Sequence, residues 1–334
     1  MTIYHASRRG FLKTSGTTIA TLLAATAGKS VFAQSSVEQL RILVPNPPGS
    51  IPDTVSRLVA GHISAGGSQR ALVENRPGAS GAVAVNALKT GAVDGSTVLL
   101  APGTYVSAYP YLTEKPAYDT ARDLKPVSLA AEGVIALAVG PVVPANVGTV
   151  RELLDWMRAN PNLANVASPC VGTPPHLFEA MLFRKADVQW QHIGYAGGPP
   201  AIAALLGGQI AALALGEGIL RSHHAAGKLR VLATTGAQRS RNLPEVKTLA
   251  EQGFPDLVVV DWFAFFMPGA ASAAAIEATS AKLRTALASP ALATALTEFG
   301  MVAVSSTPAA LASRIETDQR VWERVIRENG IKID

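Results

Sequence analysis

Short apolar runs alternate with segments of helical spacing along most of the chain, and this alternation limits the possible folds more than any other feature. The apolar runs predict strands at 40–44, 71–74, 97–101, 136–139, 166–168, 229–234 and 258–266. Helical spacing predicts helices at 53–63, 81–88, 175–183, 199–206, 225–228, 273–287 and 308–328, and a capping box at 149–152 begins another. Strands that alternate with helices favour parallel sheets covered by helices, which is an α/β fold.

The first 33 residues have the order of an export signal. Arg8 and Arg9 precede an apolar run at 18–27, and small residues end at Ala33, after which we expect cleavage. The paired arginines resemble the twin-arginine type of signal. An amphipathic first helix is the alternative, but residues 1–33 contain no acidic residue and their apolar run is uniform rather than striped. The sequence therefore predicts a chain that is exported to the periplasm.

The charge and cysteine content exclude several classes of protein. Of 29 basic residues, four lie in the signal, which leaves 25 against 24 acidic residues in the mature chain. This balance and the lack of a Lys/Arg run predict no nucleic-acid partner. Cys170 is the single cysteine, so no disulfide can form within the chain. We expect a monomer without a cofactor or a metal ion.

The length of the mature chain, roughly 300 residues, predicts two lobes. Two apolar stretches, 134–139 and 258–267, are the predicted crossings between the lobes. The C-terminal helices are expected to return to the first lobe. We therefore predict that residues 34–137 and 262–334 form lobe 1 and that residues 138–261 form lobe 2.

Four strand-to-helix joints are candidate binding turns, because ligands of open α/β sheets lie beyond the carboxyl ends of strands. These joints are 46–53, 103–110, 166–176 and 195–201. In the first, Asp53 stands in the first turn of the predicted helix. In the third, Thr173 is the predicted N-cap and Pro174 the first helical residue. A helix N-terminus favours an anion, so two such joints in separate lobes suggest a carboxylate site. Ordinary βα loops are the alternative for each joint alone.

Catalytic and metal-binding interpretations have weaker support. Cys170 and His176 could be a thiol and its base, and His176 and Glu179 share a helix face, but neither pair has a third partner at a suitable spacing. His223 and His224 suit a solvent-facing turn. The segment 78–81, Gly-Ala-Ser-Gly, suits a turn between a strand and a helix. We expect no catalytic residue.

A set of ordered motifs resembles the receptors of the tripartite tricarboxylate transporter family, also called Bug receptors. The most specific motif is Glu-Asn-Arg-Pro-Gly-Ala-Ser-Gly at 74–81. Others are Pro-Pro-Gly at 47–49 with Asp53 and Arg57, Asp-Gly-Ser-Thr at 94–97, Gly-Thr-Pro-Pro-His at 172–176 and Leu-Leu-Gly-Gly-Gln at 205–209. Together they cover nearly all of the mature chain.

The resemblance implies a two-lobed, Venus-flytrap binding protein of type II that closes over a small organic carboxylate. It also implies two integral-membrane subunits of a transporter, to which the ligand is delivered. The ligand turns of the family align with Pro48, Gly49, Ser50 and Asp53, and with Val171, Gly172, Thr173 and His176. The joint at 195–201 contributes Tyr195, Gly197 and Gly198. The loop after residues 97–101 contributes Thr104 and Tyr105.

Several positions depart from the family pattern. Ser50 and Cys170 stand where relatives usually have glycine, and Leu215 aligns with an aspartate that faces an amino group in some relatives. Ala196 replaces a common lysine, and Tyr105, Val106 and Tyr109 replace smaller or more polar residues. These changes remove charge and add ring surface. We therefore expect a ligand of low polarity, such as an aromatic carboxylate.

Two other functional classes are compatible with the same residues. The closed receptor could engage a membrane sensor kinase, which is a signalling role. A secreted hydrolase that uses Cys170 is a more remote alternative, and it would turn over a substrate where a receptor only binds one.

Overall fold

The computed structural model of the protein describes residues 38–67 and 69–333. The predicted export signal and its cleavage site lie outside these residues. The strands are β1 (Glu38–Val44), β2 (Gln69–Asn75), β3 (Thr97–Pro102), β4 (Leu124–Val139), β5 (Asn165–Ser168), β6 (Gln191–Gly194), β7 (Ala212–Gly216), β8 (Arg230–Thr234), β9 (Val260–Pro268) and β10 (Met301–Ala303).

Helices follow most of these strands. The α-helices are α1 (Ile51–Ala65), α2 (Ala82–Lys89), α3 (Thr104–Ser107), α4 (Tyr109–Leu112), α5 (Thr120–Asp123), α6 (Val150–Ala159), α7 (Pro174–Lys185), α8 (Gly198–Leu206), α9 (Glu217–Ala225), α10 (Ala273–Leu287), α11 (Pro290–Glu298) and α12 (Pro308–Asn329). Short 3₁₀ turns lie at Ala79–Gly81, Pro161–Leu163 and Ala250–Gln252. The first of these is the turn that the sequence predicted at 78–81.

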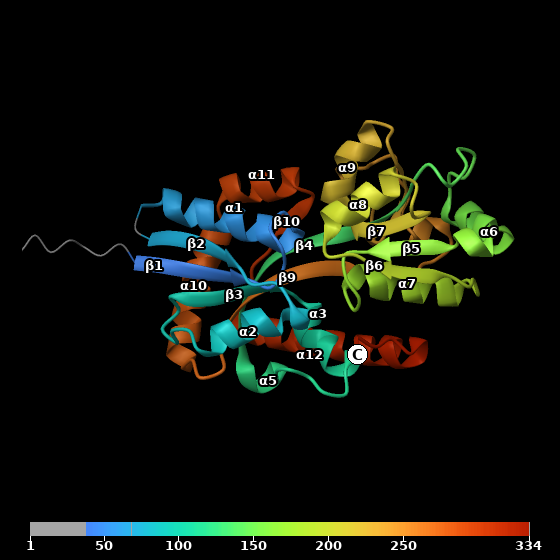
Figure 1. Cartoon of the computed structure of the whole chain (residues 1–334). Coiled ribbons are helices and arrows are strands. Elements are labelled where there is room, and N and C mark those ends of the chain that lie inside the picture. The colour runs from blue at the N-terminus through green and yellow to red at the C-terminus, as the bar shows by residue number, and fades with distance from the viewer. Residues whose placement is uncertain (1–37, 68, 334) are drawn as a thin grey trace, which may run out of the picture. The chain divides into compact units, whose positions relative to one another are not determined.

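In the described part of the chain, all strands belong to one sheet in the order β2-β1-β3-β9-β4-β7-β5-β6, and β10 and β8 also pair with β4. The long strand β4 changes partners between Val134 and Ile135. Residues before this point pair with β9 and β10, and residues after it pair with β7 and β8. Strand β4 therefore joins a first sheet portion (β1, β2, β3, β9, β10) to a second (β5 to β8), as Figure 1 shows.

The sheet is mixed rather than uniformly parallel. The trios β2-β1-β3 and β6-β5-β7 are parallel, as predicted. Strand β9 runs antiparallel to β3 and β4, and β7 and β8 run antiparallel to β4. The direction follows from the path of the chain, because β4 carries it from the first portion to the second and β9 carries it back.

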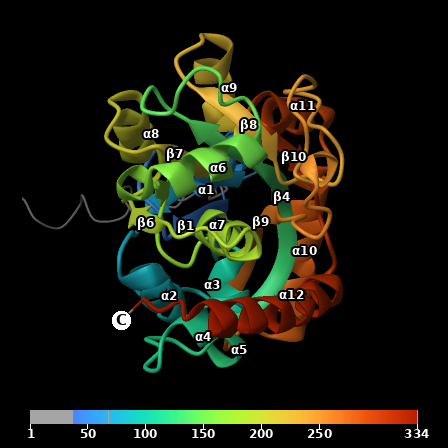
Figure 2. The ribbon, with the colours of Figure 1, turned by 90° about the vertical axis from the view of Figure 1, so that its right-hand side faces the viewer.

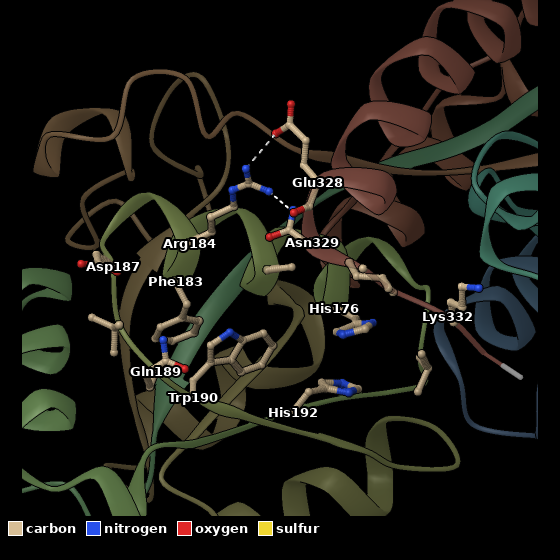
Figure 3. A pocket seen from close by; sticks show the side chains of 15 residues that line it. His176, Phe183, Arg184, Asp187, Gln189, Trp190, His192, Glu328, Asn329 and Lys332 are labelled. Atoms are coloured by element: carbon tan, nitrogen blue, oxygen red, sulfur yellow. Dashed lines mark hydrogen bonds and ion pairs between the residues drawn. The ribbon is translucent and has the colours of Figure 1, made fainter.

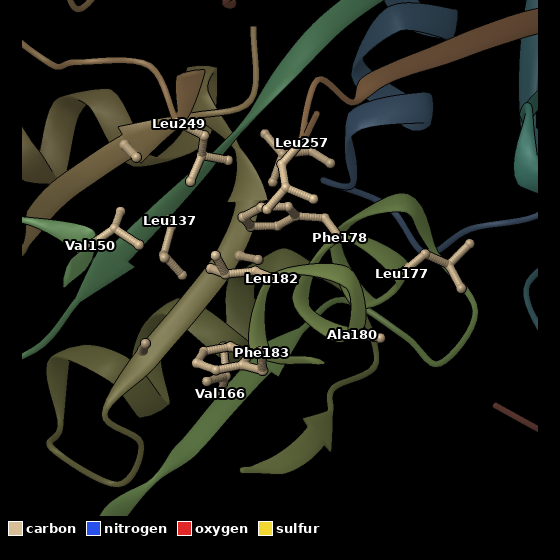
Figure 4. Close-up of a cluster of buried hydrophobic side chains, with 14 of the residues drawn as sticks. Leu137, Val150, Val166, Leu177, Phe178, Ala180, Leu182, Phe183, Leu249 and Leu257 are labelled. Carbon is tan, nitrogen blue, oxygen red and sulfur yellow. The ribbon is translucent and has the colours of Figure 1, made fainter. Parts of the chain in front are cut away.

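Helices cover both faces of each sheet portion, because strand residues alternate between two cores. In the first portion, Leu40 and Ile42 face α1, α10 and α11, whereas Leu43 and Leu99 face α2. In the second portion, Leu137 and Val166 face α6 and α7 (Figure 4), and the opposite face packs on α8 and α9.

The C-terminal helix α12 contacts both sheet portions. Near its start, Leu311 belongs to the core that α2 covers. Near its end, Trp322, Val325 and Ile326 belong to the core around α7. Figure 2 shows α12 running along the base of the molecule beneath α7 and α3. This helix is thus a second physical link between the portions, beside the strands.

Thr235 holds the two crossing segments together where β4 changes partners. Its hydroxyl accepts a hydrogen bond from the Ile135 amide at 3.0 Å and donates one to the Val259 carbonyl at 2.5 Å. Its backbone pairs with the same two residues. Because Thr235 is 1% exposed, water cannot replace these bonds. A single side chain therefore couples the outgoing strand to the start of the returning one.

Replacing Thr235 with valine should lower the free energy of unfolding by about 1–3 kcal/mol, because it leaves a buried amide and a buried carbonyl without partners. Urea denaturation measures this change from the transition midpoint.

Thr234→Val is the matched control, since the Thr234 hydroxyl is also buried but has no hydrogen-bond partner among the described residues. Its stability should stay unchanged or rise slightly. Equal losses in the two variants would show that the Thr235 hydroxyl does not couple the strands.

Candidate functional site

The first predicted binding turn lies between β1 and α1, and Asp53 determines its shape. The buried carboxylate accepts hydrogen bonds from the Gly49 amide at 2.9 Å, from Arg57 Nε at 3.0 Å and from Asn75 Nδ2 at 2.9 Å. Burial opposes ionisation of Asp53, but the bonds from Arg57, Gly49 and Asn75 outweigh it and lower its pKa. Asp53 therefore stabilises the turn through its hydrogen bonds, and Arg57 already balances its charge.

Ser50, one of the departures from the family pattern, uses its hydroxyl within the same turn. It is the N-cap of α1, and its Oγ donates to the Pro47 carbonyl at 2.6 Å. Gly49 has a φ of +79°, which favours glycine there, and both Pro48 and Gly49 are exposed. The structure thus places the hydroxyl of Ser50 inside the turn.

The second turn, between β5 and α7, is also closed by internal hydrogen bonds. Thr173 is the N-cap, as predicted, and its hydroxyl donates to the Cys170 carbonyl at 2.8 Å. The Gly172 amide donates to Nδ1 of His176 at 3.0 Å. Pro174 and Pro175 have no N–H, so His176 is the first residue of α7 that carries an amide proton. Val171 stays 40% exposed at the tip.

Hydrogen bonds link the four predicted turns in two pairs. The Asn46 side-chain amide of the first turn lies 3.5 Å from the Tyr105 hydroxyl. The Cys170 thiol of the turn before α7 donates to the Tyr195 carbonyl at 3.6 Å. Residues 46 and 105 thus connect two turns of the first sheet portion, and residues 170 and 195 connect two turns of the second.

Apolar side chains cover the glycines of this region. A Cβ atom at Gly172 would lie 2.4 Å from Cδ1 of Leu112, and one at Gly216 would lie 2.4 Å from Cδ1 of Ile51. A Cβ atom at Gly198 would lie 3.3 Å from Leu215. The turns can approach these side chains so closely only because glycine has no side chain. Ile51 and Leu112 were not predicted as site residues.

The side chains of Tyr109 and His224 have surroundings that the sequence did not predict. Tyr109 is buried, stacks on Tyr118 at 4.3 Å and accepts a hydrogen bond from the Ala117 amide at 2.8 Å, so it lies in the core and not beside the turns. His224 was expected to face solvent. Instead it lies on α9, and its Nδ1 accepts a hydrogen bond from the Val231 amide at 3.2 Å.

The geometry does not favour catalysis by Cys170 or by a serine triad. Burial raises the pKa of the Cys170 thiol, and Nδ1 of His176 is occupied by the Gly172 amide. Ser168 and Glu179 both approach the same nitrogen of His192, Nε2, at 2.8 Å and 3.8 Å. A triad needs the acid on the other ring nitrogen. Among the described residues, no group of three or more His, Cys, Asp or Glu could hold a metal ion.

Behind the second turn lies a buried group of ionisable side chains. The rings of His176 and His192 stack at 3.7 Å. Burial lowers the pKa of His176 to about 3 and that of His192 to about 4, so both are neutral at pH 7. Burial also raises the pKa of Glu179 well above its usual range, more than the Ala214 amide lowers it. The two histidines therefore support the turn without carrying charge.

A cavity of about 720 Å³ lies beside the second turn rather than among the four turns. Figure 3 shows it between α7, the segment before β6 and the end of α12. Of the predicted site residues, only Val171 and His176 line it. Its Arg184 already binds the carbonyl of Glu328, and Phe183 stacks on Trp190 at 4.9 Å. The cavity therefore does not coincide with the predicted binding turns.

A family model described as the tripartite tricarboxylate transporter family receptor matches residues 55–331. The chain belongs to this receptor family. Protein BugT of Bordetella pertussis is 30% identical over 295 residues, which cover 88% of this chain and 90% of BugT. The resemblance seen in the motifs is thereby confirmed, and the members of this family are transporter receptors rather than enzymes.

Solved structures of the family have the same fold. An adipate-bound protein of R. palustris superposes with a TM-score of 0.82 at 25% identity, covering 88% of this chain and 98% of the other. MatC of Rhodopseudomonas palustris, with bound malate, gives 0.78 at 25% identity, covering 87% and 99%. The fold is thus the two-lobed α/β fold of a periplasmic solute-binding protein. Among the helices of the described residues, none is long and apolar enough to cross a membrane.

Replacing Glu179 with glutamine should stabilise this receptor, and the gain should grow as the pH rises above about 4.5. Glu179 has a raised pKa in the folded state, so folding must take up a proton wherever the unfolded carboxyl is ionised. Glutamine removes that cost. Urea denaturation between pH 4 and pH 8 measures the difference from wild type. The two histidines lower stability as the pH falls from about 6.5 toward about 4, and this loss cancels in the comparison.

Glu152→Gln is the matched control with the opposite sign. The pKa of Glu152 is lowered by the amides of Gly148 and Thr149 in a capping box, so losing its charge should reduce stability at pH 7. If the Glu179 variant also lost stability at pH 7, this result would contradict a raised pKa of Glu179 in the folded state.

Proposed function

We propose that the protein is a periplasmic receptor that captures a small organic carboxylate where the four turns meet. The receptor delivers this ligand to the two integral-membrane subunits of a tripartite tricarboxylate-type transporter. The observation that carries this proposal is the contact between the two sheet portions at the turns, where Ile51 lies against Gly216 and Leu112 lies against Gly172. Export by the N-terminal signal would place the mature chain, as a monomer, in the periplasm.

A carboxylate is the ligand class that fits these turns best. Helix starts present amide N–H groups and a partial positive charge, and family neighbours are solved with adipate and malate. Nearby, Arg57 is paired with Asp53 at 3.0 Å, so recognition would rely on amides and hydroxyls. The proposed contacts are Pro48, Gly49, Ser50, Thr104, Tyr105, Val171, Gly172, Thr173, Tyr195, Gly197 and Gly198. Asp53 and His176 would act by shaping the turns.

The surroundings of the turns favour a ligand with an apolar body. Ile51 and Leu112 cover glycines of the opposite sheet portion, and Leu215 lies against Gly198. The Tyr105 ring adds an aromatic surface to the turn after β3. No chemical step is proposed, since Ser50, Asp53 and Thr173 use their side chains in hydrogen bonds within the turns.

Binding would require the two sheet portions to separate and close. We propose lobe 1 at 34–137 and 262–334 and lobe 2 at 138–261, with α12 in contact with both. Opposite the α7 contact, α9 meets the end of α11. Arg221 Nη2 donates to the Glu298 carbonyl at 2.6 Å, and a Cβ atom at Gly218 would lie 1.7 Å from the Phe299 carbonyl oxygen. These contacts would hold the closed form.

A thermal-shift screen should find carboxylates that raise the melting temperature of the mature chain. A ligand at a hundred times its Kd adds about 2.7 kcal/mol to the stability of the folded state. The panel contains aliphatic, amino-acid and aromatic carboxylates, and the control for each is its neutral amide, such as benzamide for benzoate. Equal shifts from acids and amides would contradict the anion site. If no carboxylate shifts the transition, the receptor proposal is wrong.

Gly218→Ala should weaken binding of every ligand alike, because the added methyl prevents α9 from meeting α11. Overpacking costs about 1–3 kcal/mol, which corresponds to roughly five- to a hundredfold in Kd. Cys170, the only thiol in the chain, reports the motion, and its alkylation without ligand should become faster.

Gly61→Ala is the matched control. Gly61 is an exposed residue of α1, and a Cβ atom there would contact nothing within 4 Å. Its affinity and alkylation rate should equal those of wild type. Unchanged binding in the Gly218 variant would show that the α9–α11 contact does not govern closure.

A further inference from the structure

Two buried polar atoms near the meeting point of the turns lack hydrogen-bond partners within the described residues. They are Oδ1 of Asn46 and Oγ1 of Thr104. Thr104 is 4% exposed. A buried polar atom without a partner costs about 1–3 kcal/mol, so native proteins usually provide one. Asn46 was part of the first predicted turn but was not predicted to touch the ligand.

Asn46 and Tyr105 together leave both hydrogen-bond donors and an acceptor unused. Nδ2 of Asn46 lies 3.5 Å from the Tyr105 hydroxyl. If the amide nitrogen donates to Tyr105, the Tyr105 O–H and the second amide N–H remain as donors and Oδ1 remains as an acceptor. If the amide is turned over, so that Tyr105 donates to the amide oxygen, the NH₂ and the phenolic oxygen remain. Both orientations therefore match a group that donates and accepts at once.

No charged side chain hydrogen-bonds to these groups in the part of the chain that the structure describes. The nearby carboxylate of Asp53 is engaged by Gly49, Arg57 and Asn75. Burial raises the pKa of Tyr105, so its hydroxyl keeps its proton at neutral pH. A carboxylate only accepts and an ammonium group only donates, so each would satisfy one side of the pair. A hydroxyl group satisfies both.

The pair is held in a fixed position before any ligand arrives. The Tyr105 ring fills the space beside Gly81, where a Cβ atom would lie 2.5 Å from it. Tyr118 donates its hydroxyl to the Tyr105 carbonyl at 3.0 Å, and Asn75 donates to the Asn46 carbonyl at 3.0 Å.

We infer that the ligand carries a hydroxyl group in addition to its carboxylate, and that this hydroxyl binds between Asn46 and Tyr105, on the turn that also holds Thr104. The inference rests on the proposed carboxylate receptor and narrows its substrate class to hydroxy acids with an apolar body. The helix starts would take the carboxylate, and the Asn46–Tyr105 pair would select the other end. Asn46 and Tyr105 are thus specificity-determining residues.

Two series of probes that differ only at the far end test this inference. Hexanoate, 6-hydroxyhexanoate and adipate share a six-carbon chain and end in a methyl, a hydroxyl and a carboxylate group. Benzoate, 4-hydroxybenzoate and terephthalate repeat the comparison on a rigid ring. Calorimetry on the mature chain should show about tenfold tighter binding of the hydroxylated member than of the unsubstituted one in at least one series, which corresponds to about 1.4 kcal/mol.

Tyr105→Phe should reduce this ratio to about one, because it removes the hydroxyl that distinguishes the probes and keeps the ring. The matched control is Tyr111→Phe, since the Tyr111 hydroxyl makes no hydrogen bond within the described residues; it should keep the ratio. Asn46→Leu provides an independent test on the other member of the pair, and melting curves confirm that each variant folds.

The possible outcomes separate this inference from the receptor proposal. A hydroxyl preference that survives Tyr105→Phe and Asn46→Leu would overturn it, as would tighter binding of adipate or terephthalate than of the hydroxy acids. Binding of other carboxylates, but of no member of either series, would also overturn it and leave the receptor proposal standing. If no carboxylate of any kind binds, the receptor proposal itself fails.

Discussion

The structure depends on the passage of β4 through both sheet portions, with Thr235 holding the crossing in place. Because β4 is continuous, the two parallel trios on either side of it are fixed in direction relative to one another. Each of the four turns follows the carboxyl end of a strand: β1, β3, β5 or β6. The two sheet portions meet at these turns, where Ile51 lies against Gly216 and Leu112 lies against Gly172. The proposed site lies between the same turns.

Strongly periodic elements could be predicted from the sequence, because their pattern is local. Helix α10 and most of α12 and α1 were placed correctly, as was the capping box of α6. Strand β7 and helix α9 were missed, because β7 ends at Gly216 and α9 begins at the next residue with no turn between them. The helix predicted at 225–228 was wrong, since α9 ends at Ala225. The first part of β4 was missed because its pairing with β9 joins residues more than a hundred positions apart, and no local signal reports that.

The turns of the site could be predicted, but the side chains that complete them could not. The contact between Leu112 and Gly172 and that between Ile51 and Gly216 depend on how the two sheet portions meet. Tyr109 lies in a loop that was predicted to add ring surface, but its side chain turns into the core and stacks on Tyr118. Asn46 carried a signal that could have been used, namely a polar amide two residues after a buried strand.

The prolines at the helix starts limit how firmly the receptor can hold an anion. Pro52, Pro174 and Pro199 each occupy an early position in α1, α7 or α8 and remove an amide donor that would otherwise face the turn. A site with few donors suits one carboxylate better than a multiply charged anion such as phosphate, which needs many. It also favours fast dissociation, because affinity differences between similar complexes lie mostly in the off-rate. A receptor that passes its ligand to a membrane partner, as proposed above, would benefit from such weak binding.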